Sequence, residues 1–226
     1  MSNNNQLAEQ YRLRFESSQT YRNGVWQILC NNFFQDFIPP QAAVLDLGAG
    51  WAEFIGNIRC AQKFAMDLNP DTAKHIQADV HFLNQDCSQR WQLNSESLDV
   101  VFTSNFLEHL TNKQSVEATV VEAHRCLKTG GLMVCIGPNI KYLPGAYWDF
   151  WDHHVPMTEN SLAELLKMTG FDIEHCVPRF LPYTMSDGWQ PPLGFIKLYL
   201  KLKFVWPIFG KQFLIIARKH GAELKQ

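Results

Sequence analysis

Three acidic residues follow apolar segments that have the composition of buried strands. Asp46 lies in Val-Leu-Asp-Leu-Gly-Ala-Gly, where Gly48 and Gly50 follow an apolar, β-branched run. Asp67 follows Phe-Ala-Met, and Asp86 follows His-Phe-Leu-Asn-Gln. A glycine turn lets a ligand approach the backbone, and a carboxylate at a strand end can accept hydrogen bonds from ribose hydroxyls. The series therefore favours a site for a nucleotide-type ligand, although each member also has a plainer interpretation: a bare tight turn, a helix cap before Pro70, and a solvated turn acid.

A second group of polar side chains follows the apolar segment 132–136. Asp152, His153 and His154 are consecutive, and an imidazole oriented by a carboxylate can remove a proton from a hydroxyl. The alternative is that His153 and His154 are structural, because they shortly precede a helix that begins near Thr158. We expect no metal at these three residues, since adjacent side chains rarely converge on one ion without distant partners. The candidates for substrate binding in this region are Asn139, Tyr142, Tyr147 and Trp148.

Hydrophobic periodicity predicts the elements that must position these groups. The predicted strands are 43–47, 63–68, 80–84, 98–103, 132–136, 171–178 and 212–217, and the predicted helices are 11–37, 52–59, 71–77, 113–127 and a helix after Thr158 that Gly170 ends. Strands that alternate with helices predict an α/β, doubly wound, mostly parallel sheet. We expect a single domain over 1–226, with a helical cap at 1–37 and an aromatic, basic excursion at 179–211.

The order and spacing of these motifs over roughly residues 40–180 resemble those of the class I methyltransferases that depend on S-adenosylmethionine (SAM). The resemblance implies a Rossmann-like sheet of seven strands with an antiparallel last strand. It also implies transfer of a methyl group, with SAM as cofactor and S-adenosylhomocysteine (SAH) as product. The cofactor-binding residues that it implies are Asp46, Gly48, Ala49, Gly50, Asp67, Leu68, Asp86, Cys87, Ser104 and Asn105.

Two further positions bear on the resemblance. Ala52 stands where a third glycine often follows, so we expect a slightly altered turn. Glu108 and His109 are similar to a Glu-His pair of many members, and for His109 the structural interpretation, an anchor at a helix start, is favoured over a catalytic one.

The sequence says less about the identity of the methyl acceptor than about the cofactor. SAM carries an activated methyl group, so the enzyme needs a general base only if the acceptor holds a proton, as a hydroxyl does. The chain is also similar to methyltransferases encoded among bacterial glycan genes, which implies a small-molecule or glycan-type acceptor, methylated at oxygen. Two alternatives stay open: a non-catalytic protein that binds SAM, and an NAD-dependent oxidoreductase, because NAD-binding proteins use an acid at the place of Asp67.

Charge and composition limit the partners and the location. Residues 193–226 carry seven basic residues and one acid, whereas the rest of the chain has a net charge of −8. An acidic body argues against a nucleic-acid partner. The basic, aromatic segment 193–209 is interpreted first as a helix that packs on its own domain. A peripheral membrane contact with Trp206 at the headgroup level, a cap over the substrate pocket and a dimer contact are the alternatives. Six scattered cysteines and no signal peptide predict a cytoplasmic protein, with the membrane-peripheral location as an option, and the oligomeric state is left open.

Overall fold

We describe a computed structural model of the chain, in which residues 9, 12–14, 16–183 and 190–221 are described. The chain divides into two compact units. The first contains residues 1–86 and 184–203, and the second contains residues 87–183 and 204–226. The expectation of a single domain over 1–226 stays a prediction, and each unit is presented separately below.

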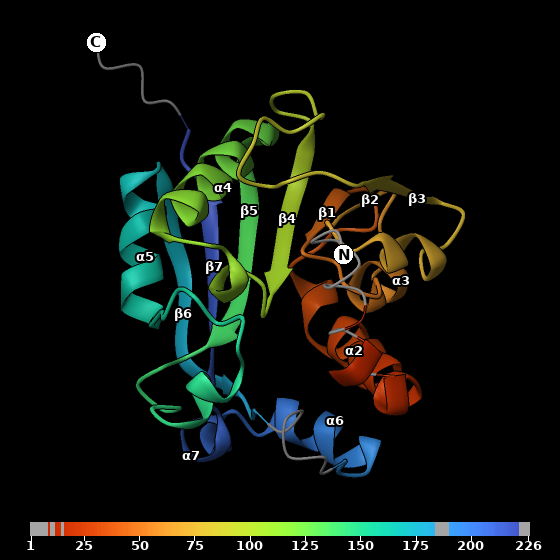
Figure 1. The fold of residues 1–226 in the computed structure, drawn as a ribbon, viewed down its shortest axis with the longest axis vertical. Coiled ribbons are helices and arrows are strands. Elements are labelled where there is room, and N and C mark those ends of the chain that lie inside the picture. The colour runs from red at the N-terminus through yellow and green to blue at the C-terminus, as the bar shows by residue number, and fades with distance from the viewer. Residues whose placement is uncertain (1–8, 10–11, 15, 184–189, 222–226) are drawn as a thin grey trace. The chain divides into compact units, whose positions relative to one another are not determined.

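The first unit contains three parallel strands, which run side by side in the order β3-β2-β1 (Figure 1). β1 (Ala43–Leu47) is buried throughout, as its unbroken apolar sequence predicts, and it pairs with β2 (Gln62–Met66). β2 pairs in turn with β3 (Val80–Leu83). The turns after these strands carry the acidic residues that the sequence singles out.

Helices complete the first unit. They are η1 (Glu16–Ser18), α2 (Gln19–Asn32), η2 (Phe34–Asp36), α3 (Glu53–Asn57), η3 (Pro70–Lys74) and α6 (Leu193–Lys201). α2 packs against both α3 and α6, and the Tyr21 hydroxyl donates a hydrogen bond of 2.7 Å to the carbonyl of Pro191. The predicted continuous helix over 11–37 is wrong. α2 ends before Phe33, whose φ of −146° leaves the helical region.

The second unit contains four strands in the order β4-β5-β7-β6 (Figure 1). β4 (Leu98–Ser104) and β5 (Leu127–Pro138) are parallel, whereas β7 (Gln212–Lys219) is antiparallel to both β5 and β6 (Phe171–Leu181). The hairpin-like end of the sheet that the family resemblance implies is therefore present. β5 begins directly after the preceding helix, five residues before its predicted start at 132, because Leu127 already pairs with Leu98.

Helices of the second unit cover its sheet. They are η4 (Leu107–His109), α4 (Lys113–Cys126), η5 (Ala146–Asp149), α5 (Glu159–Met168) and α7 (Trp206–Phe209), and η6 (Lys203–Val205) joins the two units. α4 contacts β5, while α5 contacts β6 and β7. Thr158 caps α5 as predicted: its hydroxyl accepts a hydrogen bond from Ser161 N–H, and the Ser161 hydroxyl accepts one from Thr158 N–H. This cap fixes the end of the loop that carries the candidate histidines.

Candidate active site

The turn after β1 has the backbone conformation that its glycines predict. Gly48 and Gly50 have φ of 71° and 54°, in the left-handed region that side chains disfavour. Ala52, in place of a third glycine, is also left-handed, with φ of 60°, and begins α3. The alanine therefore keeps the turn but holds it in a strained conformation.

Asp46 lies within β1 and is 4% exposed. Its Oδ2 accepts a hydrogen bond of 3.3 Å from the N–H of Ile55 in α3. Burial raises the pKa of the Asp46 carboxyl to about 8, against the lowering effect of this hydrogen bond. The contact orients the turn between β1 and α3.

Asp67 connects two turns of the first unit. Its Oδ2 accepts a hydrogen bond of 2.7 Å from Gly50 N–H, and its Oδ1 accepts one of 2.7 Å from Asn69 N–H. The two carboxylate oxygens carry about four acceptor sites in all. Leu68, the next predicted cofactor residue, follows Asp67 in the chain and is 37% exposed.

The predicted adenine site follows β3. Asp86 is exposed at the end of the first unit. Cys87 is buried in the second unit, where its carbonyl accepts a hydrogen bond of 2.7 Å from Trp91 Nε1 and its thiol accepts one of 3.4 Å from the Thr119 hydroxyl. These contacts hold the backbone around Cys87, and the adenine-binding role of the two residues stays a prediction.

The end of β4 also departs from ordinary backbone geometry. Asn105 has φ of 48°, and its N–H donates a hydrogen bond of 2.9 Å to the carbonyl of Ile136. Its Nδ2 donates to the Ser104 hydroxyl at 3.1 Å. Asparagine tolerates the left-handed region better than most residues, and such conformations cluster at functional sites.

The four predicted substrate-binding residues fall into two classes. Asn139 is fully buried, and its Nδ2 donates to Glu159 Oε2 at 2.6 Å and to the carbonyl of Pro178 at 2.9 Å. Tyr147 is also fully buried, and its hydroxyl donates to the carbonyl of Val155 at 2.7 Å. Trp148, by contrast, is 56% exposed, and Tyr142 lies half-buried beneath the guanidinium of Arg179. Of the four, Tyr142 and Trp148 are thus accessible to a ligand.

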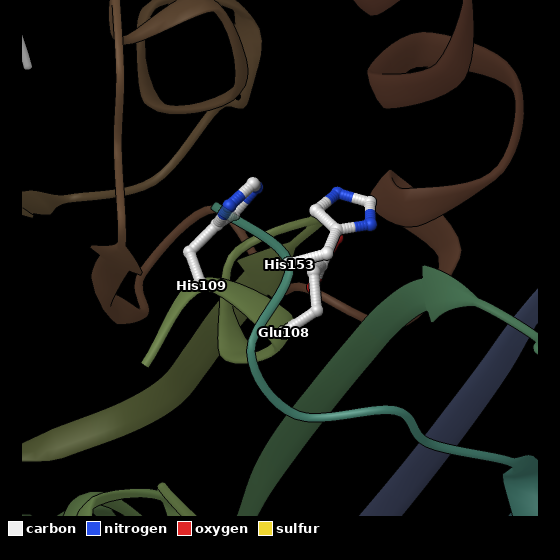
Figure 2. A group of neighbouring side chains, drawn as sticks. All are labelled: Glu108, His109 and His153. Carbon is white, nitrogen blue, oxygen red and sulfur yellow. The ribbon is translucent and has the colours of Figure 1, made fainter. Parts of the chain in front are cut away.

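The structure brings His153 together with Glu108 and His109, a set that we call the Glu108 cluster (Figure 2). One side-chain nitrogen or oxygen atom of each residue lies within 4.8 Å of those of the other two. The carbonyl of Glu108 accepts hydrogen bonds from the N–H groups of His154 (2.8 Å) and Val155 (3.1 Å), which ties the loop before α5 to η4. The side chain of His154 is exposed, so only His153 of the two candidate catalytic histidines belongs to this group.

Asp152 pairs with His109. The Nδ1 atom of His109 lies 3.1 Å from the carbonyl oxygen of Asp152 and 3.1 Å from its carboxylate. Burial alone would lower the pKa of His109, but the hydrogen bond to Asp152 and the charges of Glu108 and Asp152 raise it above its ordinary value. His109 thus links η4 to the loop before α5, whereas its predicted role as an anchor at a helix start stays a prediction.

Glu108 is the residue of this group that sequence reasoning named only with His109 and did not place beside His153. It is 1% exposed, and burial raises the pKa of its carboxyl to about 6, against the lowering effect of His109. The sequence carried a signal, because Glu108 and His109 are consecutive and follow shortly after β4. Its proximity to His153, however, depends on a contact between residues 45 positions apart in the chain.

The segment 193–209, for which a membrane contact is one alternative, has both exposed and buried aromatic or apolar side chains. α6 exposes Phe195 and Leu198, at 63% and 49%. Trp206 was predicted to lie at a lipid headgroup level, but this is wrong, since it is 6% exposed and packs edge-on against Phe180. No helix in the described part of the chain is long and apolar enough to span a bilayer.

Comparisons with known proteins bear on what this arrangement does. Residues 45–135 match the family model described as a methyltransferase domain. No curated protein sequence matches the chain significantly. A SAM-dependent methyltransferase from Archaeoglobus fulgidus is 20% identical, with 91% of this chain and 99% of that chain covered and a TM-score of 0.67.

Two other solved structures widen the comparison. A complex of the Haloferax volcanii Trm112 methyltransferase activator with a methyltransferase matches with 16% identity, coverage of 92% and 95%, and a TM-score of 0.66. The [4+2]-cyclase SpnF matches with 16% identity, coverage of 80% and 75%, and a TM-score of 0.53. These similarities confirm the doubly wound, mostly parallel sheet of seven strands. They concern the fold, which also occurs in a protein named for a different reaction.

Proposed function

We propose that this chain is a class I SAM-dependent methyltransferase that transfers the methyl group of SAM to a hydroxyl of a small-molecule or glycan-type acceptor. The observation that carries the choice of oxygen is the presence of His153 beside Glu108 in a nearly water-free site. A hydroxyl holds its proton at neutral pH, so its methylation benefits from a nearby group that takes or polarises that proton.

On the cofactor side, the first unit supplies the turn after β1 and the acid after β2. We propose that Gly48, Ala49 and Gly50 lie against the amino acid part of SAM, with Asp46 holding the turn in place. Asp67 and Leu68 would meet the ribose, because a carboxylate that Gly50 and Asn69 hold beside the glycine turn can accept hydrogen bonds from ribose hydroxyls. Further cofactor contacts are proposed for Asp86, Cys87, Ser104 and Asn105.

On the acceptor side, Trp148 and Tyr142 are the predicted residues with exposed surface. An aromatic face suits the apolar side of a sugar ring or of another small acceptor. Asn139 and Tyr147 would act indirectly, because they hold the loop that carries these residues. His153 would engage the acceptor hydroxyl, and His154, whose side chain is exposed, is the weaker candidate.

Binding of SAH measured by isothermal titration is the first test, with the cofactor-stripped protein and its Asp67→Asn variant. We expect micromolar binding that weakens about tenfold or more in the variant, as for loss of a charge-assisted hydrogen bond. Folded protein that binds neither SAH nor SAM would overturn the proposal. A fluorescence response to NADH instead would favour an oxidoreductase.

Transfer is tested with radiolabelled SAM and a panel of matched acceptors, each sugar offered as its hydroxyl and its amino form. Label in the hydroxyl form alone supports O-methylation, and label in the amino form alone excludes it. Fractions of a cell extract are then offered as acceptors in the same assay. Binding of SAH without transfer to any of them would favour the alternative of a non-catalytic SAM-binding protein.

For localisation, we propose that α6 contacts an anionic membrane surface from the cytoplasmic side. Its exposed Phe195 and Leu198 and its lysines 197 and 201 are the composition that interfacial helices show. Sedimentation with anionic liposomes at low salt tests this, with neutral liposomes and Phe195→Ser as controls. No sedimentation with anionic liposomes would refute it.

A further inference from the structure

We propose that the Glu108 cluster binds one divalent transition-metal ion, such as Zn²⁺, through Glu108, His109 and His153. Two imidazoles and one carboxylate are a donor set that holds Zn²⁺ and related ions in enzymes while leaving positions open for another ligand. The sequence alone predicts no metal, because it offers only the consecutive residues 152–154. In the folded chain, His153 instead lies beside Glu108 and His109, which belong to a separate segment (Figure 2).

The buried carboxylate of Glu108 is the first observation that points to a cation. Both oxygens are inaccessible to solvent, and no other described residue donates a hydrogen bond to either of them. A buried polar group without such partners is costly, and a buried carboxylate especially so. A cation held against these oxygens would supply the interaction that no other described residue provides.

The orientation of His109 is the second observation. Its Nδ1 faces the carboxylate and carbonyl of Asp152, which are acceptors, so Nδ1 carries a proton. That leaves the lone pair of Nε2 for a metal. A carboxylate behind a ligating histidine is the usual arrangement around zinc, where it fixes the ring and raises its basicity.

The spacing of the three residues agrees with a common ion. Ligand atoms around a tetrahedral Zn²⁺ lie about 3.4 Å from one another, given metal–ligand distances near 2.1 Å. One nitrogen or oxygen atom of each residue lies within 4.8 Å of those of the other two, so side-chain rotations that shift these atoms by about an ångström would be needed to reach that separation. The backbone hydrogen bonds from His154 and Val155 to Glu108 already hold the two segments together.

Aromatic rings limit the access of water to this group. The ring of His153 stacks on Phe150 at 4.9 Å between centroids and lies 4.6 Å from the ring of Tyr147. An apolar shell of this kind strengthens electrostatic contacts to an ion and controls which ligand reaches it.

The consequence for catalysis rests on the proposed function. An ion with an open position would bind the acceptor oxygen and lower the pKa of its hydroxyl, so that His153 acts on the acceptor through the ion. Nitrogen-rich donor sets favour transition metals over Mg²⁺, which prefers oxygen ligands. We therefore expect Zn²⁺, Co²⁺ or Mn²⁺ to bind more tightly than Mg²⁺.

Titration of the metal-free full chain with Co²⁺ and Zn²⁺ tests the proposal directly. It uses calorimetry for stoichiometry and Co²⁺ visible absorption for geometry. Cys176→Ser is the background throughout, because this exposed thiol could bind metal adventitiously. We expect one ion per chain, binding at least 10-fold weaker in Glu108→Gln, about 10-fold weaker in Asp152→Asn, and unchanged in His154→Ala, the exposed neighbour.

Three results would overturn the inference: no binding, binding that Glu108→Gln leaves unchanged, or equal loss in His154→Ala. Thermal unfolding shows whether each variant folds; should Glu108→Gln not fold, X-ray absorption of the Co²⁺-loaded parent protein must show nitrogen and oxygen ligands. SAH binding is measured on the same metal-free protein. Its loss together with intact metal binding would refute the proposed function alone, whereas the reverse would refute the metal site alone.

Discussion

The backbone N–H of Gly50 donates a hydrogen bond of 2.7 Å to Oδ2 of Asp67, although the two residues lie on different turns of the first unit. The other carboxylate oxygen accepts from Asn69 N–H at the same distance. One side chain thus fixes both the glycine turn after β1 and the turn after β2. The residue predicted to meet the cofactor ribose is also the residue that shapes the adjoining loop.

Replacement of Asp67 by asparagine should therefore reduce stability as well as cofactor affinity. An amide has one acceptor oxygen, so one of the two N–H groups loses its partner. We expect a loss of about 1–2 kcal/mol in the free energy of unfolding, measured by urea denaturation. The matched variant Asp36→Asn changes an exposed residue and should stay within about 0.5 kcal/mol of the parent. Equal stability of the Asp67 variant and the parent would contradict the two hydrogen bonds.

The buried Asp46 makes stability depend on pH in a defined direction. Its pKa is about 8 in the folded protein, whereas an aspartate of the unfolded chain ionises near 3.9. Between these values the folded state holds a proton that the unfolded state has lost, so stability falls as pH rises, by up to about 1.4 kcal/mol per unit. Asp46→Asn should remove this slope.

Urea denaturation at several pH values between about 5 and 8 measures the effect of Asp46. The stability of the parent should fall steadily across this range, whereas that of the variant should stay nearly level, so the gap between them should widen toward the high end. Asp149→Asn, at an exposed position in η5, should leave the slope as it is in the parent. A slope that Asp46→Asn leaves unchanged would show that Asp46 is ionised in the folded protein.

The left-handed Ala52 predicts a stabilising substitution. Its φ of 60° costs an alanine about 1–2 kcal/mol, whereas glycine adopts this conformation without strain. Glycine also loses more backbone entropy on folding, by about 0.5–1 kcal/mol. Ala52→Gly should therefore raise the free energy of unfolding by about 0.5–1 kcal/mol in thermal or urea denaturation. A loss of stability would mean that the turn at Ala52 is not left-handed in solution.

Tyr147 should contribute to stability through its hydroxyl. The bond of 2.7 Å to the carbonyl of Val155 lies in a buried site, and Tyr147→Phe leaves that carbonyl without this donor. We expect a loss of about 1–2 kcal/mol in the free energy of unfolding. Tyr142→Phe, at a half-buried position, is the matched control, and it should change stability by less than about 0.5 kcal/mol. Similar values for the two variants would argue against the buried hydrogen bond.

Sequence patterns predicted the local elements of the fold well, for reasons that are themselves local. β1 and β7 are short apolar runs, α5 begins at a Thr158 cap, and the glycines 48 and 50 form the tight turn. Each depends on residues within a few positions of one another. Where prediction failed, as at Phe33 and Leu127, the element boundary was decided by a backbone angle or a strand partner that no local pattern contains.

By itself, the sequence determined which residues could do chemistry and on which elements they stand, because hydrophobic periodicity and turn residues are written along the chain. Only the tertiary structure decided which of them meet. Asp152 is a neighbour of His153 in sequence, yet its carboxylate faces His109, while His153 lies with Glu108. The two hydrogen bonds to the carbonyl of Glu108 impose that choice, since they join segments 46 and 47 residues apart. Contacts over such distances depend on the path of the whole loop, and no spacing in the sequence encodes it.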